Sequence, residues 1–185
     1  MNEIKLKVEN IELKTFSLDE VNTLYQLIDK NRALIGEWLI WVDKTNSVED
    51  VKKLIEEYSR RKEKGEGMNF GIWYQTKLIG YISYAYINTE SKKANIAYWL
   101  DIDYQGKGII TKSCETLIDY GFNQLNLHRI EISCAEGNSK SRAIPERLGF
   151  TKEGVFRESE LIRGGTLVDN HFYALLKQDW EIRVL

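Results

Sequence analysis

The sequence predicts a single α/β domain built on a mixed sheet, with helices distributed along the chain. The predicted order is strand, two helices, three strands, helix, strand, helix and two strands, which suits a layered sandwich better than a parallel doubly wound fold. The length of 185 residues suffices for one buried core. Proline is nearly absent, and no low-complexity segment marks a linker. We therefore expect residues 1–185 to form one domain.

The N-terminal part of the chain predicts short strands followed by two amphipathic helices. Residues 4–16 alternate in polarity and indicate one or two strands. Ser17 and Glu20 form a capping box for a helix that should run to about Asn31. Ser47 then caps a second helix. The apolar stripes of these helices are Val21, Leu24, Leu27 and Ile28 in the first, and Val51, Leu54, Ile55 and Tyr58 in the second.

The remaining predicted elements are strands interrupted by two helices. Segments 69–74 and 77–87 flank a short polar turn and predict a hairpin. Helices are expected from the glycine-containing turn at 104–108 to about Asn123, and over 139–148. Further strands are expected over 94–100, 129–135, 151–156, 159–162 and 166–176. We expect the two halves of the sheet to meet between 94–100 and 129–135.

Composition and charge argue against several classes of function. The formal net charge is −2, and no basic patch indicates a nucleic-acid partner. No apolar signal region or membrane-length run is present, so we expect a soluble cytoplasmic protein without a membrane partner. Cys114 and Cys134 lack disulfide or metal-site spacing and are interpreted as core thiols. We expect no metal site.

The most informative segment is the glycine-containing turn YQGKGIITKS, residues 104–113, which leaves a predicted strand and opens a predicted helix. Such a turn presents unpaired backbone N–H groups at the positive end of the helix dipole. Gly106 and Gly108 lack a Cβ, so a phosphate can approach the backbone closely. The patterns for nucleoside triphosphates and dinucleotides do not fit. The turn is therefore a candidate phosphate site for a nucleotide-like cofactor, although a turn without any ligand remains an alternative.

Two motifs together carry a family resemblance. Gln105 and Gly108 are similar to the Q-x-x-G-x-[G/A] pyrophosphate loop of the GNAT superfamily of coenzyme-A-dependent acetyltransferases, with Ile110 at the last position. The segment EGNSKSRAIPERLGF, residues 136–150, resembles the second cofactor motif of that superfamily, through Asn138, Ser141, Glu146, Arg147, Gly149 and Phe150. The order of the two motifs, with one helix and one strand between them, also fits. Pro145 departs from the pattern and predicts a kink near Ser141.

A narrower resemblance covers essentially the whole chain. Segment 31–51, the frame IAYWLDIDYQGKGIITKS and the stretch from Gly149 to Leu176 resemble ribosomal-protein-serine N-acetyltransferases of the Rim type, RimJ and RimL. The resemblance implies the GNAT fold, a mixed and mostly antiparallel central sheet flanked by helices. It also implies acetyl-CoA as the donor, a protein N-terminal amine as the acceptor, direct attack without an acyl-enzyme, and a homodimer.

The resemblance assigns roles to individual residues. Glu160 would be the general base, and Ser141 the general acid, with Tyr173 as the alternative. Period-two alternation puts Glu158 on the same face as Glu160, so Glu158 is the alternative base. The backbone N–H near Leu100 would hold the thioester carbonyl, and Trp38 and Trp41 would line the acceptor site. The cofactor-binding set would be Leu100, Gln105, Gly106, Lys107, Gly108, Ile109, Ile110, Thr111 and Asn138.

Plainer roles and other functions stay open at this stage. Glutamates are usually solvated, Ser and Asn at 138–141 suit helix capping, and tryptophans usually pack in the core. The acceptor could instead be a small amine, such as a polyamine or an aminoglycoside. A non-catalytic acyl-CoA-binding module is a third reading, although it would not need Ser141 and Glu160.

Overall fold

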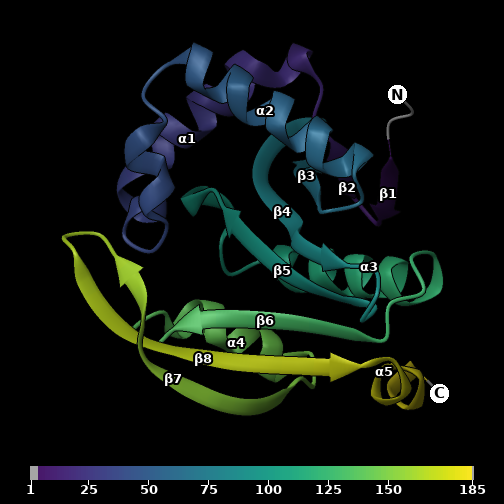
Figure 1. Cartoon of the computed structure of the whole chain (residues 1–185). Helices are drawn as coiled ribbons and strands as arrows, with labels where there is room; N and C mark the ends of the chain where they lie inside the picture. The colour runs from purple at the N-terminus through teal and green to yellow at the C-terminus, as the bar shows by residue number, and fades with distance from the viewer. Residues whose placement is uncertain (1–3, 185) are drawn as a thin grey trace.

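The computed structural model of the protein describes residues 4–184 and contains one eight-stranded sheet with helices on both faces (Figure 1). The strands lie in the order β1-β2-β3-β4-β5-β6-β8-β7. The strands are β1 (Lys5–Val8), β2 (Ile11–Thr15), β3 (Met68–Tyr74), β4 (Lys77–Asn88), β5 (Lys93–Leu100), β6 (Arg129–Ala135), β7 (Thr151–Ile162) and β8 (Thr166–Leu176). The helices are α1 (Val21–Gly36), α2 (Val48–Glu63), α3 (Ile109–Asn123), α4 (Ser139–Arg147) and α5 (Lys177–Val184), with short 3-10 turns η1 (Leu18–Glu20), η2 (Ile40–Lys44) and η3 (Ile102–Tyr104).

The predicted helix starts in the N-terminal half are confirmed. Ser17 and Glu20 form the capping box, which opens η1 and leads directly into α1. Ser47 caps α2 by accepting a hydrogen bond from the N–H of Asp50 at 3.1 Å. Helix α1 continues beyond its predicted end near Asn31, because Ile35 is buried and extends the apolar stripe by a further turn.

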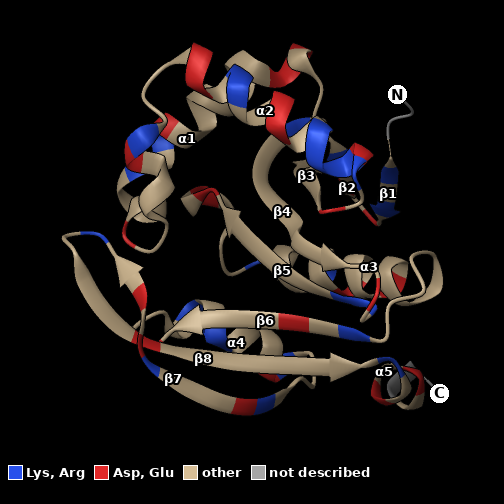
Figure 2. Cartoon of the chain, viewed as in Figure 1, with Lys and Arg blue, Asp and Glu red and all other residues tan. Residues whose placement is uncertain are grey.

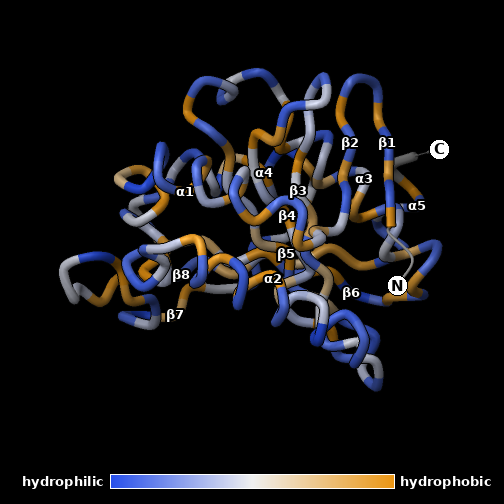
Figure 3. The backbone as a smooth tube through the Cα atoms, turned by 90° about the horizontal axis from the view of Figure 1, so that it is seen from above, coloured by the Kyte–Doolittle hydropathy of each residue, from blue (hydrophilic) through white to orange (hydrophobic). Residues whose placement is uncertain are grey.

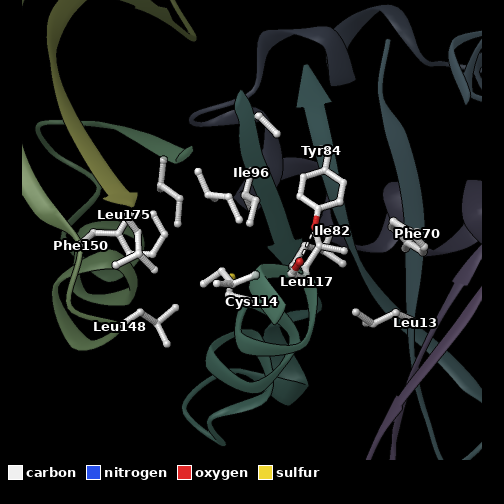
Figure 4. Close-up of a cluster of buried hydrophobic side chains, with 14 of the residues drawn as sticks. Leu13, Phe70, Ile82, Tyr84, Ile96, Cys114, Leu117, Leu148, Phe150 and Leu175 are labelled. Carbon is white, nitrogen blue, oxygen red and sulfur yellow. Dashed lines mark hydrogen bonds between the residues drawn. The ribbon is translucent and has the colours of Figure 1, made fainter. Parts of the chain in front are cut away.

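Two apolar layers lie on opposite faces of the sheet. Helices α1 and α2 cover one face, the α1/α2 face, where Val21, Leu24, Ile28 and Ile55 pack against strand residues such as Trp99. Helices α3 and α4 lie on the other, the α3/α4 face, whose core is larger. Figure 4 shows part of this core, in which the buried Tyr84 hydroxyl donates to the carbonyl of Leu117 in α3. Apolar segments gather along the strands, and hydrophilic ones in the outer loops (Figure 3).

The sheet opens between β5 and β6. These two strands pair in parallel through three residue pairs at their starts, from Lys93 with Arg129 to Asn95 with Glu131. All other strand pairs are antiparallel. Beyond Asn95 and Glu131 no pairing is formed, and the strands separate toward their C-terminal ends (Figure 1). We call this place, where the backbones of β5 and β6 diverge, the β5–β6 opening, and it lies where the sequence predicts that the two halves meet.

The C-terminal part differs from the prediction in two respects. The segments predicted as separate strands at 151–156 and 159–162 form one strand, β7, whose pairing with β8 is interrupted between Phe156 and Glu160. Helix α5 is not predicted from the sequence, because its apolar spacing is short and weak. Trp180 of α5 is buried against the core on the α3/α4 face, so packing holds this helix.

Basic and acidic residues are interspersed over helices and strands (Figure 2). Within residues 4–184, no helix is long and apolar enough to cross a membrane. The same described residues contain no group of three or more His, Cys, Asp or Glu placed to hold a metal ion.

Candidate active site

The glycine turn has the geometry of an anion site. Gly106 and Gly108 both have a φ of 74°, in the left-handed region that favours glycine. A Cβ added to either residue would meet no atom within 4 Å, so the space beside the turn is free. Helix α3 starts at Ile109, and no side chain caps it at Gly108. The N–H groups of the first turn of α3 are therefore available to a phosphate.

Both sequence motifs meet at this turn. The Nε2 of Gln105 donates to the Leu100 carbonyl at 3.3 Å, and its Oε1 accepts from the Nζ of Lys140 in α4 at 3.3 Å. Arg147, also in α4, donates to the Thr111 hydroxyl at 2.9 Å. The cations of α4 thus stand beside the start of α3, where they would favour a phosphate further.

Leu100 stands at the edge of the β5–β6 opening. The N–H of Asp101 donates to the Ile79 carbonyl of β4 at 2.8 Å. Because successive N–H groups of a strand point to opposite sides, the N–H of Leu100 is directed toward β6, across the opening. The predicted carbonyl-binding donor therefore faces the gap, on the same strand end as Gln105.

Ser141 lies on the α3/α4 side of the opening. The Asn138 side chain caps α4 by accepting from the N–H of Ser141 at 3.1 Å, so its capping role is observed. The Ser141 Oγ lies 3.2 Å from the Cys134 Sγ and 3.3 Å from the Tyr98 hydroxyl. Ser141 is thereby placed between β5 and β6, where they diverge.

Tyr98 supplies the hydrogen-bond donor that Pro145 cannot provide within α4. Pro145 lies inside α4 and has no N–H for the carbonyl of Ser141, which is the loss behind the predicted kink. In the structure the Tyr98 hydroxyl donates to this carbonyl at 3.0 Å. A side chain of β5 therefore replaces the missing helix bond and ties α4 to the edge of the opening.

We expect Tyr98→Phe to destabilise the protein by about 1–3 kcal/mol, because the Ser141 carbonyl loses its donor. In a Pro145→Ala background the loss should be smaller, since the new N–H at position 145 can reach the same carbonyl. Denaturant unfolding of the four proteins in this double-mutant cycle measures the coupling. Equal losses in both backgrounds would contradict the compensation.

Neither cysteine has the properties of a nucleophile. Burial raises the pKa of the Cys134 thiol to about 11, and it raises the pKa of the fully buried Cys114 further above its ordinary value. Thiolates are the reactive form, and both thiols are mostly protonated near neutral pH, which argues against a nucleophilic role.

The resemblance implies acetyl transfer, and we expect Cys114→Ala and Cys134→Ala to retain this activity within a few-fold of the parent protein. The measurement is steady-state CoA release, and the fraction of folded protein in each sample serves as the control. A loss of more than about a hundredfold in a folded variant, the size of a removed nucleophile, would indicate a covalent role for that cysteine.

Glu160 lies on the α1/α2 face of the sheet, in the edge strand β7. Cys134 packs in the α3/α4 core and lies opposite His171, so the neighbouring residue Asn170 faces the α1/α2 layer. Glu160 lies opposite Val168, which shares that face with Asn170, and its carboxylate accepts from the Asn170 Nδ2 at 2.8 Å. Partial burial raises the pKa of Glu160 above its ordinary value.

Glu158 does not share the surroundings of Glu160, contrary to the alternation expected from the sequence. It is exposed and has a φ of 49°, and its N–H donates to the Asp169 carboxylate at 2.9 Å. The interruption of β7 pairing disturbs the period of two at this point. Tyr173, the alternative to Ser141, donates to the Glu146 carboxylate at 2.9 Å.

The two tryptophans take different positions. The Trp38 ring lies beside Gly137, where an added Cβ would come within 2.9 Å of the Trp38 Cη2. Trp38 is therefore next to Asn138 and the start of α4. Trp41 instead packs into the core beneath α1 and α2. The structure thus brings one of the two predicted acceptor residues to the opening.

Sequence reasoning missed three contributors to this region: Tyr98, Asn170 and the ion pair of Asp43 with Arg163. The two side chains of this pair make paired hydrogen bonds, one of them at 3.2 Å. The hydrogen bond from the Arg163 guanidinium lowers the pKa of Asp43. Because this carboxylate is already paired with Arg163, it is not a free site for a cationic amine. The pair connects η2 to the turn between β7 and β8. No local sequence pattern links residues 120 positions apart.

Comparisons with known proteins find similarity over most of the chain. A family model described as an acetyltransferase (GNAT) domain matches residues 10–151. The ribosomal-protein-serine acetyltransferase of Escherichia coli is 34% identical over 154 residues, covering 83% of this chain and 86% of that protein. The spermidine N(1)-acetyltransferase of Escherichia coli is 24% identical over 155 residues, covering 84% of this chain and 80% of that protein.

A similar solved structure is that of RimL, the ribosomal L7/L12 alpha-N-protein acetyltransferase, in complex with coenzyme A. It has a TM-score of 0.92 and 28% sequence identity, and the match covers 95% of this chain and 99% of that chain. The fold expected from the sequence is therefore confirmed.

Proposed function

Because the chain belongs to the GNAT acetyltransferase family and is an acetyl-CoA-dependent N-acetyltransferase, we propose that its acceptor is the N-terminal α-amine of a ribosomal protein. The names of the ribosomal-protein-serine relative and of RimL support this acceptor class. Two observations support the proposed mechanism: the Ser141 hydroxyl lies where β5 and β6 diverge, and the half-buried Glu160 carboxylate accepts a hydrogen bond from Asn170 of β8, the strand next to β6.

The donor site fits the phosphates and the acyl group of acetyl-CoA. Left-handed glycines with free space for a Cβ admit a phosphate to the turn. The residues that would hold the donor are Gln105, Gly106, Lys107, Gly108, Ile109, Ile110 and Thr111 at the phosphates, and Asn138 along the pantetheine arm. When bound, acetyl-CoA supplies an acetyl group that is activated as a thioester.

Leu100 would act on the carbonyl oxygen of the thioester, and Ser141 would act on its sulfur. The Leu100 N–H donates to the carbonyl oxygen as negative charge develops there, and one such preorganised donor contributes on the order of 3 kcal/mol. The Ser141 hydroxyl would donate a hydrogen bond to the sulfur, which departs as a thiolate when the carbon–sulfur bond breaks. The Ser141 N–H donates to Asn138 and the Ser141 hydroxyl donates to Tyr98, and these two bonds hold the hydroxyl where β5 and β6 diverge.

Glu160 would act on the amine. An N-terminal amine has an ordinary pKa of about 8, so part of it is neutral near pH 7 and can attack directly. Once the nitrogen has attacked, the Glu160 carboxylate accepts one of its protons. Because burial raises the pKa of Glu160, its carboxylate is a stronger base than an ordinary exposed glutamate.

The acceptor is tested by incubating the protein with acetyl-CoA and either ribosomal-protein N-terminal peptides or a panel of polyamines and aminoglycosides. CoA release that depends on the peptide would support the proposal. Release with small amines alone would assign the function to the small-amine class, which the spermidine-acetylating relative represents. Tight acetyl-CoA binding without release on any acceptor would favour a non-catalytic acyl-CoA-binding module.

A cytoplasmic location and a homodimer complete the proposal, and both rest on the resemblance to the Rim-type enzymes. Light scattering on the purified protein, with and without acetyl-CoA, measures the oligomeric state. A monomer under both conditions would overturn the dimer without affecting the chemistry.

A further inference from the structure

The Asn170 side chain is a buried polar group next to the proposed base. Asn170 is 5% exposed and lies in β8, between β6 and β7, opposite Ala135 and Phe156. Its Nδ2 donates to the Glu160 Oε2 at 2.8 Å. Its Oδ1 is also buried, and it has no hydrogen-bond partner among the residues that the structure describes. Buried carboxamide oxygens are normally bonded, so this one needs an explanation.

The Glu160 carboxylate fixes the orientation of the carboxamide. An ionised carboxylate only accepts hydrogen bonds, so the amide must turn its NH₂ end toward Glu160. The Oδ1 is then the end that stays free. The flanking strands hold the backbone of Asn170 on both sides, so the group cannot relax away from Glu160 by a small shift of the chain.

The interruption in β7 places Glu160 next to this side chain. Residues 157–159 of β7 oppose Asp169 alone, and pairing resumes at Glu160 with Val168. The Asp169 carboxylate accepts the N–H of Glu158 at 2.9 Å and so anchors the irregular segment. Glu160 and Asn170 thus lie on one face of the sheet, with Asn170 opposite Ala135 at the C-terminal end of β6.

We propose that Asn170 binds the acceptor amine, holding Glu160 through Nδ2 and accepting an amine N–H on Oδ1. This inference rests on the proposed function, in which Glu160 is the base. A neutral primary amine has two N–H bonds, one for the Glu160 carboxylate and one for the Asn170 oxygen. A secondary amine has a single N–H and cannot serve both groups. Asn170 therefore selects primary amines over secondary ones.

The test compares a peptide that has a free N-terminal amine with the same peptide methylated once on that nitrogen. For the parent protein we expect a strong preference for the unmethylated peptide in kcat/KM. Asn170→Ala should lower kcat/KM for the unmethylated peptide by about ten- to a hundredfold. It should also reduce the preference for the unmethylated peptide at least about fivefold, because the preference depends on the hydrogen bond from the amine N–H to Asn170. The KM for acetyl-CoA should not change.

The matched control is Asn69→Ala, which truncates another buried asparagine. Asn69 lies in β3, and its Oδ1 accepts a hydrogen bond from the Tyr81 hydroxyl of β4 at 2.6 Å. A purely structural role for Asn170 would lower turnover of both peptides equally and leave their ratio at the parent value, which would overturn the inference. If only small amines are acetylated, the same comparison uses the amine that reacts and its N-methyl derivative. An absence of transfer to every amine by the parent protein would overturn the proposed function together with this inference.

Discussion

Replacing Glu160 with glutamine is expected to reduce kcat for the acceptor peptide by about 10²–10⁴-fold, the usual contribution of a positioned general base. The affinity for CoA should not change, because Glu160 lies on the α1/α2 face and the glycine turn leads into α3 on the other side. Glutamine keeps the size of the side chain and an oxygen for the Asn170 donor. The measurement combines steady-state kinetics with CoA binding by calorimetry.

The stability of the same variant provides an internal control. Because burial raises the pKa of Glu160, the folded protein binds this proton more tightly than the unfolded chain does. Ionisation therefore costs stability as the pH rises above the ordinary glutamate pKa of about 4.3, and the cost is complete above the raised pKa of the folded state. Glu160→Gln should accordingly be more stable than the parent at pH 7, and this gain should vanish near pH 4. A variant that loses activity together with stability at pH 7 would contradict the assignment.

Gly108→Ala is expected to weaken CoA binding by at least about tenfold, equivalent to about 1.4 kcal/mol. The added methyl group would occupy the free space beside the turn, into which the phosphates must come close to the backbone. The residue also has a φ of 74°, where alanine is strained by about 1–2 kcal/mol, so some stability is lost as well. Titration calorimetry with CoA measures the affinity, and thermal unfolding measures the strain.

Gly65→Ala separates the two effects. Gly65 has a φ of 69° in the turn that follows α2, and an added Cβ there also meets no atom within 4 Å. It should therefore lose a similar amount of stability without any loss of CoA affinity. Equal effects of both substitutions on CoA binding would contradict a phosphate site at Gly108.

The elements of the fold could be predicted where the sequence signal is local. The Ser17 and Ser47 caps, the hairpin of β3 and β4, and the glycine turn that opens α3 all depend on residues close together in the chain. Helix α5 could not be predicted, because Trp180 is held by tertiary packing rather than by an amphipathic repeat. Helix α1 runs further than expected for the same reason, because the burial of Ile35 extends it by a further turn.

The same distinction between local and long-range signals applies to the candidate site. The two motifs indicated Gln105, Gly108, Asn138 and Ser141, which lie near the ends of β5 and β6, and the resemblance indicated Glu160, which lies on β7 beside Asn170. Contacts that depend on strand register could not be read from the sequence. Tyr98 reaches Ser141 across 43 positions, and Asn170 reaches Glu160 only because of the irregular pairing of β7 with β8. Trp38 and Trp41 were equivalent in the sequence, yet only Trp38 reaches Gly137.

The most direct test of the account is to locate the acetyl group after reaction with a ribosomal-protein N-terminal peptide that also contains an internal lysine. Tandem mass spectrometry of the product distinguishes the two amines. The account predicts one acetyl group on the N-terminal α-amine, formed by the parent protein and nearly absent with Glu160→Gln. An unmodified α-amine, or one acetylated equally well by Glu160→Gln, would contradict it.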